Sequence, residues 1–285
     1  MLSVIATIPE ITTCIWEGEV VLGDGYVEVA GKKIDINRGG GALLASAAKT
    51  ADALQSPKIH AFVAGDIGLG VGSRLLYQHL LDIIPQNQFT TYAFHYLLPD
   101  TDWLGKLMLA FETISPKPKL IADAGFMYAA KMSGHANEFD LFTPDLGELA
   151  FLADEAAPHP FYTRGFILHQ ESNIQTLLKR AAEHQNTARA MLIKGAVDTI
   201  VVNDKIVNRI SEPNVPVLEA IGGTGDTITG MLAALTEDHY SPERACTMAA
   251  SINRVAGYRA HLTPADTISR LVDEIPAALK EVEKL

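Results

Sequence analysis

The stretch A-I-G-G-T-G-D-T-I-T-G-M at residues 220–231 carries the strongest structural signal in this chain of 285 residues. Its glycines precede an apolar run, which predicts a tight turn that leads into a helix over 227–235. The free N–H groups at the start of such a helix form an anion site. A phosphate therefore fits at Gly222, Gly223, Thr224 and Gly225. No Gly-Lys-Ser/Thr follows, so the stretch is not a P-loop.

Asp226 lies within this predicted anion site. A carboxylate repels a bound phosphate, so simple phosphate binding does not explain its presence. We interpret Asp226 as a general base that takes the proton from a substrate hydroxyl next to the phosphate. The alternative is a structural role, in which Asp226 caps the helix.

Short apolar segments alternate with helical segments along the chain. We expect strands at 59–64, 119–124, 139–143 and 189–194, and helices at 42–54, 73–84, 173–184, 227–235, 242–262 and 276–285. Ser73 is the expected N-cap of the second helix. The alternation predicts an α/β fold with a mostly parallel central sheet and helices on both faces. In such sheets, ligands bind at the carboxyl ends of the strands.

Three other segments complete the predicted organisation. Residues 11–36 are rich in Val, Ile and Trp and contain glycine turns, which predicts a small β-meander that serves as a flap or a sheet edge. Residues 199–210 predict a β-hairpin around Asn203-Asp204, and residues 153–165 predict an irregular insertion. No repeat and no Ser/Gly-rich linker divides the chain, so we expect a single domain over 1–285.

The composition excludes several classes of protein. Hydrophobic residues make up 48% of the chain and charged residues 20%, which excludes a disordered or collagen-like chain. With 23 basic and 34 acidic residues and no block of like charge, no nucleic-acid partner is expected. Cys14 and Cys246 are too few for a disulfide framework, which favours a cytoplasmic protein. The sequence shows no signal peptide and predicts no membrane span.

The histidines and the oligomeric state give weaker signals. The nine histidines are scattered, without the spacing of a metal site, and helical faces and loops explain them best. The sequence leaves open whether the chain forms a homo-oligomer.

Four segments occur in the same order as the motifs of a known enzyme family. They are G-D-I-G-L-G at 65–70, T-P-D-L-G-E at 143–148, I-K-G-A at 193–196 and G-G-T-G-D at 222–226. Over about residues 37–262 the chain resembles the ribokinase-like superfamily, and within it the NAD(P)H-hydrate dehydratase family. The resemblance implies a ribokinase-like fold, with the N-terminal meander outside the shared part.

The resemblance also implies roles for individual residues. Asp226 would be the catalytic base, and the turn at 222–225 would be the anion hole for the nucleotide phosphate. The nucleotide would be bound by Lys194, Gly195, Ala196 and Asn253. The substrate would be bound by Gly68, Gly70, Asp123, Asp145 and Glu148. Glu148 would also organise Mg²⁺ through water.

For several of these residues the sequence leaves a structural alternative open. Asp145 and Glu148 are spaced like a capping box at a helix start. Lys194 fits a solvated surface lysine. Asn253 and Arg254 fit the polar face of a helix.

Departures from the family's pattern at Asp145 and Gly125 concern the substrate. Asp145 stands where the dehydratases have a histidine that holds the hydrated nicotinamide. Gly125 stands where they have the second Asp of an Asp-Ala-Asp strand end, whose first Asp matches Asp123. These departures leave the identity of the substrate open.

The resemblance implies an enzyme that uses ADP or ATP, with Mg²⁺, to phosphorylate the hydroxyl of hydrated NADH or NADPH and then eliminates phosphate. An alternative keeps only the first step, as an ATP-dependent kinase of a sugar, a vitamin precursor or another alcohol. A third hypothesis is a nucleotide-binding module without catalysis, which the presence of Asp226 argues against. In all three the ligand is a small molecule.

Overall fold

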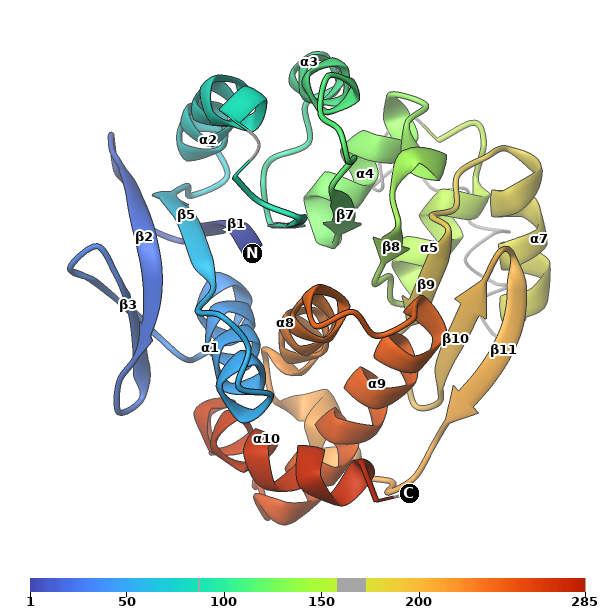
Figure 1. The fold of residues 1–285 in the computed structure, drawn as a ribbon. Helices are drawn as coiled ribbons and strands as arrows, with labels where there is room; N and C mark the ends of the chain where they lie inside the picture. The colour runs from blue at the N-terminus through green and yellow to red at the C-terminus, as the bar shows by residue number, and fades with distance from the viewer. Residues whose placement is uncertain (87, 158–172, 285) are drawn as a thin grey trace.

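The computed structural model describes residues 1–86, 88–157 and 173–284. In these residues, eleven strands form one sheet in the order β11-β10-β9-β8-β7-β6-β1-β5-β2-β3-β4 (Figure 1). The strands are β1 (Leu2–Ile8), β2 (Ile15–Leu22), β3 (Tyr26–Val29), β4 (Lys32–Asp35), β5 (His60–Gly65), β6 (Thr91–His95), β7 (Lys119–Ala122), β8 (Leu141–Phe142), β9 (Ala190–Ile193), β10 (Asp198–Val202) and β11 (Lys205–Ile210).

The centre of the sheet is parallel. Neighbouring strands from β9 through β8, β7, β6 and β1 to β5 all run in the same direction. In β1 every residue is buried, because helices cover both faces of a parallel sheet. The carboxyl ends of these strands therefore meet along one edge of the sheet.

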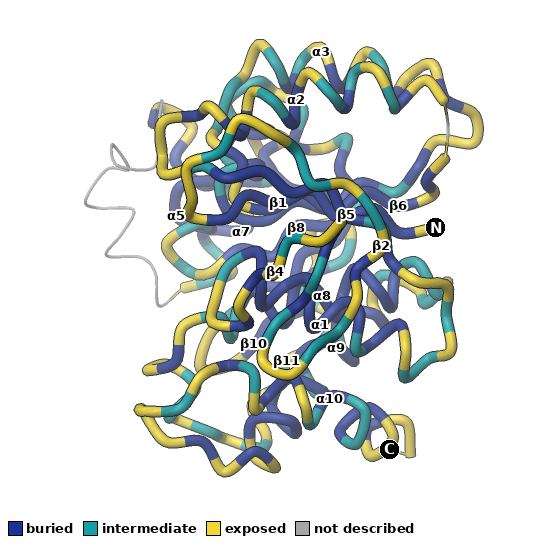
Figure 2. Tube along the Cα trace, turned by 90° about the vertical axis from the view of Figure 1, so that its left-hand side faces the viewer, coloured by how far each residue is buried: buried dark blue, intermediate teal, exposed yellow. Residues whose placement is uncertain are grey.

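Helices cover the two faces in two groups. They are α1 (Gly39–Ala53), α2 (Val71–Ile83), α3 (Thr101–Glu112), α4 (Ala124–Met132), α5 (Leu146–Ala153), α7 (Ile174–Glu183), α8 (Thr224–Glu237), α9 (Pro242–Arg259) and α10 (Ser269–Val282). Figure 1 shows α2, α3, α4, α5 and α7 on one face, and α1, α8, α9 and α10 on the other. Each group encloses its own apolar core, and Figure 2 shows the buried strands between them. The predicted α/β fold is confirmed.

Antiparallel strands extend the sheet at both ends. At one end, β2 pairs with β5 and continues through β3 and β4, which confirms the predicted meander over 11–36. At the other end, β10 and β11 form the predicted hairpin. Its turn residues Asn203 and Asp204 have φ of 48° and 61°, the left-handed conformation that a tight hairpin turn requires.

Helices α1 and α8 pack with their backbones in close contact. A Cβ atom at Gly230 of α8 would collide with the Ser46 side chain and the Leu43 carbonyl of α1. The small residues of α1 therefore let α8 lie directly against it. This packing brings the starts of the two helices together, where residue 226 meets residue 39.

The structure differs from the sequence-based predictions at several places. Strands β1 and β6 and helices α3, α4 and α5 were not predicted. The prediction of Ser73 as an N-cap is wrong: Gly70 occupies that position, and the Ser73 hydroxyl donates to Asp66. Of the predicted insertion over 153–165, residues 158–165 lie outside the described residues. No helix in the described part of the chain is long and apolar enough to cross a membrane.

Candidate active site

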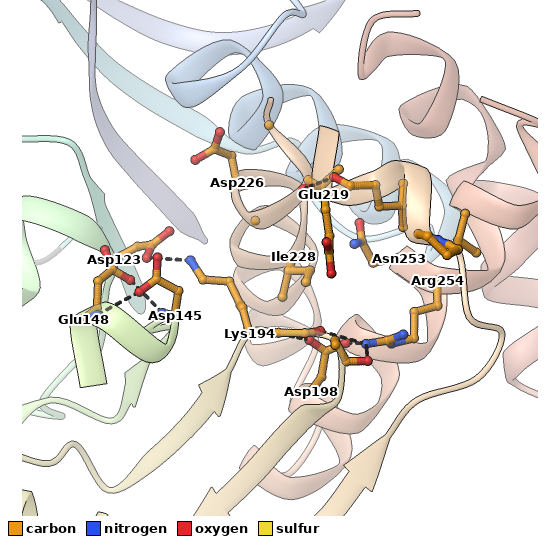
Figure 3. Close-up of a pocket in the computed structure, with 18 of the residues that line it drawn as sticks. Asp123, Asp145, Glu148, Lys194, Asp198, Glu219, Asp226, Ile228, Asn253 and Arg254 are labelled. Carbon is orange, nitrogen blue, oxygen red and sulfur yellow. Dashed lines mark hydrogen bonds and ion pairs between the residues drawn. The ribbon is translucent and has the colours of Figure 1, made fainter. Parts of the chain in front are cut away.

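A cavity of about 500 Å³ opens at the carboxyl edge of the parallel strands, beside the starts of α8 and α4 (Figure 3). Its described lining includes Asp123, Asp145, Glu148, Lys194, Gly195, Ala196, Gly223, Thr224, Gly225, Asp226, Asn253 and Arg254. Most residues predicted for the site thus line one cavity, although they come from five separate segments of the chain.

Asp226 lies in the first turn of α8 and is buried, with 7% of its surface exposed. Its Oδ2 accepts a hydrogen bond of 2.6 Å from the Gly39 N–H, and its Oδ1 accepts one of 2.8 Å from His95 Nε2. The N-cap of α8 is Gly223, so the alternative that Asp226 caps the helix is wrong. Burial raises the pKa of Asp226, but the hydrogen bonds from His95 and Gly39 outweigh it, and the pKa lies below its ordinary value. The carboxylate is therefore ionised at neutral pH.

The turn before α8 has the geometry of an anion site. Gly223 has φ of 100°, and a Cβ there would lie 3.1 Å from the Arg38 Cα, so a glycine is needed. The first N–H groups of a helix have no partner within it. Thr224 and Gly225 carry such groups and line the cavity. Gly222 is exposed beside Arg38 and is not part of the lining.

Lys194 follows β9 and reaches across the cavity to Asp123, as Figure 3 shows. Its Nζ lies 3.0 Å from Asp123 Oδ1, and its side chain is 15% exposed. A Cβ on Gly225 would lie 3.5 Å from the same Nζ, so the ammonium is next to the start of α8. Burial lowers the pKa of Lys194, but the neighbouring carboxylates of Asp123 and Glu148 outweigh this effect. The pKa therefore lies above its ordinary value, and the group stays charged. The alternative of a solvated surface lysine is wrong.

Asp145 and Glu148 form a capping box at the start of α5. Asp145 Oδ1 accepts from the Glu148 N–H at 2.7 Å, and Glu148 Oε2 accepts from the Asp145 N–H at 2.8 Å. The structural alternative is thus correct, yet both side chains also line the cavity. Burial, with Asp123 and Asp145 nearby, raises the pKa of Glu148 to about 7 against the opposing effect of Lys194.

Asn253 and Arg254 of α9 are buried, so the alternative of an exposed polar helix face is wrong for both. Asn253 Oδ1 accepts from the Thr227 hydroxyl at 2.7 Å. The Arg254 guanidinium donates to Asp198 at 2.8 Å and to the carbonyl oxygens of Gly195 and Ala196 at 3.0 and 2.9 Å. Arg254 therefore fixes the backbone that follows Lys194.

Two predicted substrate residues lie outside the described wall of this cavity. The N–H groups of Gly68 and Gly70 both donate to the Asp66 carboxylate, at 2.9 Å. Those donors are therefore already engaged. The departure at Gly125 also has a structural reason, because a side chain there would collide with the Leu97 carbonyl.

His95, at the carboxyl end of β6, was not predicted as a site residue. The imidazole is fully buried, with Nε2 2.8 Å from Asp226 Oδ1 and 3.6 Å from Asp123 Oδ2. The prediction that helical faces and loops account for the histidines is wrong for this one. A polar residue at the carboxyl end of a short apolar strand was the available signal. By distance alone, His95, Asp123 and Asp226 could also surround a metal ion.

Comparisons with known proteins show which family this chain resembles. The family model described as NAD(P)H-hydrate dehydratase matches residues 98–277. An uncharacterised protein of Methanocaldococcus jannaschii is 35% identical over 242 residues, which cover 85% of this chain and 100% of that protein. The ADP-dependent (S)-NAD(P)H-hydrate dehydratase of Cenarchaeum symbiosum is 27% identical over 173 residues, and the match covers 59% of this chain and 54% of that enzyme.

Solved structures share the fold. The ADP/ATP-dependent NAD(P)H-hydrate dehydratase of Bacillus subtilis, co-crystallised with ATP/Mg²⁺, superposes with a TM-score of 0.55 at 15% identity, covering 98% of this chain and 89% of that one. A ribokinase-like superfamily protein of Enterococcus faecalis gives 0.59 at 14% identity, covering 98% and 86%. The fold is therefore ribokinase-like. Since the family model spans residues 98–277, from before Asp123 to beyond Arg254, the chain belongs to the NAD(P)H-hydrate dehydratase family.

Proposed function

We propose that this chain is a nucleotide-dependent NAD(P)H-hydrate dehydratase, which phosphorylates a hydroxyl of the hydrated dinucleotide and then eliminates phosphate. The observation that carries the proposal is the ionised, doubly hydrogen-bonded Asp226 at the start of α8. The cavity that it lines also contains residues of the segments 143–148 and 193–196, which resemble motifs of the family. A carboxylate beside an anion site serves a reaction in which a hydroxyl loses its proton as a phosphoryl group arrives.

The nucleotide in this proposal is ADP or ATP. The C. symbiosum relative is named as ADP-dependent, and the B. subtilis enzyme was co-crystallised with ATP/Mg²⁺. The N–H groups of Thr224 and Gly225 would hold the phosphates, and Lys194 would neutralise part of their charge. The adenine base of the nucleotide would lie toward the Gly195-Ala196 segment and Asn253, which line the same cavity. Gly222 would support the turn without touching the ligand.

The carboxylates of the wall fit a magnesium ion. Mg²⁺ prefers oxygen ligands and keeps several waters, and Glu148 together with Asp145 offers such oxygens at the cavity. Glu148 would hold the ion through water. The ion would neutralise charge on the phosphates in a cavity where acidic side chains outnumber basic ones.

The proposed reaction has two stages. The substrate oxygen attacks the terminal phosphorus, its proton passes to Asp226, and the bond to the leaving nucleotide breaks. The anion site at the start of α8 stabilises the charge on the phosphoryl group in flight. In the second stage the carbon–oxygen bond of the phosphorylated substrate breaks, phosphate leaves, a proton is lost from the neighbouring carbon and a double bond forms.

A second candidate function is a small-molecule kinase that performs only the first stage. Asp145 favours it, because this carboxylate replaces the family's nicotinamide-binding histidine and its Oδ1 is engaged in the capping box. The departure at Gly125 also removes a family carboxylate. Both candidates use the same base, anion site and nucleotide.

A substrate panel tests the proposal. The protein is incubated with ADP or ATP and Mg²⁺, first with hydrated NADH and then with a set of sugars and vitamin-precursor alcohols. A dehydratase restores NADH absorbance and releases one phosphate per NADH. A kinase instead accumulates a phosphorylated alcohol and leaves hydrated NADH unchanged, and that result would replace the first proposal with the second.

A further inference from the structure

His95 is held at the junction of three elements. It ends β6, it faces Asp226 of α8, and it approaches Asp123 at the N-cap of α4. The Tyr96 ring packs edge-on against the imidazole, with 4.2 Å between centroids. The Thr7 hydroxyl donates to the Tyr96 carbonyl at 2.7 Å, which fixes the backbone at the end of β6. The imidazole is thus rigidly placed beside the proposed base.

The direction of the hydrogen bond follows from the charge of its partner. An ionised carboxylate only accepts hydrogen bonds, so the hydrogen between His95 Nε2 and Asp226 Oδ1 must be on the nitrogen. His95 Nδ1 is buried and has no hydrogen-bond partner among the described residues. The bond to Asp226 is therefore the hydrogen bond that defines the orientation of this ring.

The arrangement is unlike that of a metal centre. A metal-bound histidine usually donates its second ring N–H to a carboxylate or carbonyl, and the described residues offer His95 Nδ1 no such partner. Asp123 is also already engaged, by the Lys194 ammonium at 3.0 Å and the Thr229 hydroxyl at 2.8 Å. The three side chains instead form a hydrogen-bonded and charge-paired cluster.

Asp226 is held from two sides by different elements. His95 binds Oδ1 and the Gly39 N–H binds Oδ2, so the carboxylate cannot rotate without losing one of these bonds. Each oxygen accepts one protein hydrogen bond, and a carboxylate has about four lone-pair positions. Lone pairs remain free for a substrate hydroxyl in the cavity that Asp226 lines.

We infer that His95 is a positioning residue for the reaction: by donating from Nε2 to Asp226 it fixes the rotation of the carboxylate and keeps it ready to accept the substrate proton. This inference rests on the proposed role of Asp226 as the base. His95 belongs to none of the four sequence motifs, and it lies 131 residues from Asp226 in the sequence.

The hydrogen bond also predicts a pH signature. A hydrogen bond to the charged form of an acid lowers its pKa, and the bond from His95 is the strongest such influence on Asp226. Removing it should raise the pH at which the base becomes protonated. Around His95 and Asp226 the charged or titratable groups of the described residues include Asp123 at the start of α4, Lys194 after β9, Tyr96 after β6 and Glu148 of α5.

The test compares His95→Leu, which has no donor, with His95→Gln, whose amide nitrogen can replace Nε2. In His95→Leu, kcat should fall up to about 100-fold with little change in the KM for the nucleotide. The acidic limb of kcat/KM should move up by about one pH unit. His95→Gln should recover most of kcat and return the limb toward the wild-type position.

Two results would overturn the inference. Equal losses in both variants without movement of the acidic limb would mean that His95 only fills space. Binding of one equivalent of Zn²⁺ alone by the wild type, lost in His95→Leu, would mean that His95 is a metal ligand.

A separate measurement distinguishes failure of the inference from failure of the proposed function. If the wild type releases no phosphate with any substrate, the proposed function fails. The contact between His95 Nε2 and Asp226 can still be measured by ¹⁵N NMR of the imidazole. An Nε2–H signal assigned through His95→Gln that shifts in Asp226→Asn supports the positioning contact. A signal that does not respond to Asp226→Asn contradicts it.

Discussion

Replacing Lys194 with Met removes the cation that the structure places between the anion site and Asp123. The Lys194 side chain is 15% exposed, and its ammonium lies 3.0 Å from Asp123 Oδ1. If Lys194 also contacts a nucleotide phosphate, loss of that charge-assisted hydrogen bond should weaken ADP binding by about 1.5–3 kcal/mol. That range corresponds to a rise in Kd of roughly 10- to 150-fold.

The same substitution also affects folding. Breaking a buried ion pair costs about 3–5 kcal/mol when the remaining charge is left without partners. Here Asp123 keeps hydrogen bonds from the Ala124 N–H at 2.9 Å and the Thr229 hydroxyl at 2.8 Å, so we expect a loss nearer 2 kcal/mol. Urea unfolding measures this loss, and calorimetry with ADP is then performed where both proteins are folded.

Lys106→Met is the matched control. Lys106 pairs with Asp102 on the exposed side of α3, and its ammonium also lies 4.6 Å from the centre of the Trp103 ring. Its loss should change the free energy of unfolding by less than about 1 kcal/mol and should leave ADP binding unchanged. An unchanged Kd for ADP in Lys194→Met would refute the assignment of Lys194 to the nucleotide.

Three further substitutions probe the site. Gly223→Ala places a side chain on a residue with φ of 100°, which should lower the free energy of unfolding in urea by about 1–3 kcal/mol and weaken ADP binding. Wild-type affinity for ADP would argue against this turn as the phosphate site. Arg254→Met leaves the Asp198 carboxylate without its cation and should lower the free energy of unfolding by about 3 kcal/mol; a loss below about 1 kcal/mol would show that the pair is replaceable. Glu148 has a pKa of about 7 in the folded protein against an ordinary 4.5, so the folded state binds more protons between these values and this group lowers stability as pH rises through that window. Urea unfolding of Glu148→Gln should lack this decline, and an unchanged pH profile would contradict the raised pKa.

The parts of the site that were predictable are those encoded by neighbouring residues. The turn at 222–225 could be identified because its glycines and the helix that follows are contiguous in the sequence. The capping box of Asp145 and Glu148 was equally local. The β10–β11 hairpin followed from the turn residues Asn203 and Asp204.

The parts that were missed depend on contacts between distant segments. His95 acquires its role from Asp226, 131 residues away, and a five-residue apolar strand gives no hint of that partner. Lys194 and Arg254 were ambiguous for the same reason, because their carboxylate partners lie 71 and 56 residues away. Gly68 and Gly70 were assigned to the substrate by motif resemblance alone, and the motif did not predict that the N–H groups of both bind Asp66 in the same loop.

The central claim, that Asp226 is the catalytic base, is tested most directly by the kinetics of Asp226→Asn beside Asp102→Asn, an exposed control. Asn keeps one acceptor for the two donors at this position, so we expect a loss of about 1–2 kcal/mol in stability. Phosphate release should fall roughly 100- to 10,000-fold, while ADP binds equally well or more tightly because a negative charge has been removed. Asp102→Asn should match the wild type in both measurements. Wild-type turnover in folded Asp226→Asn would contradict the account.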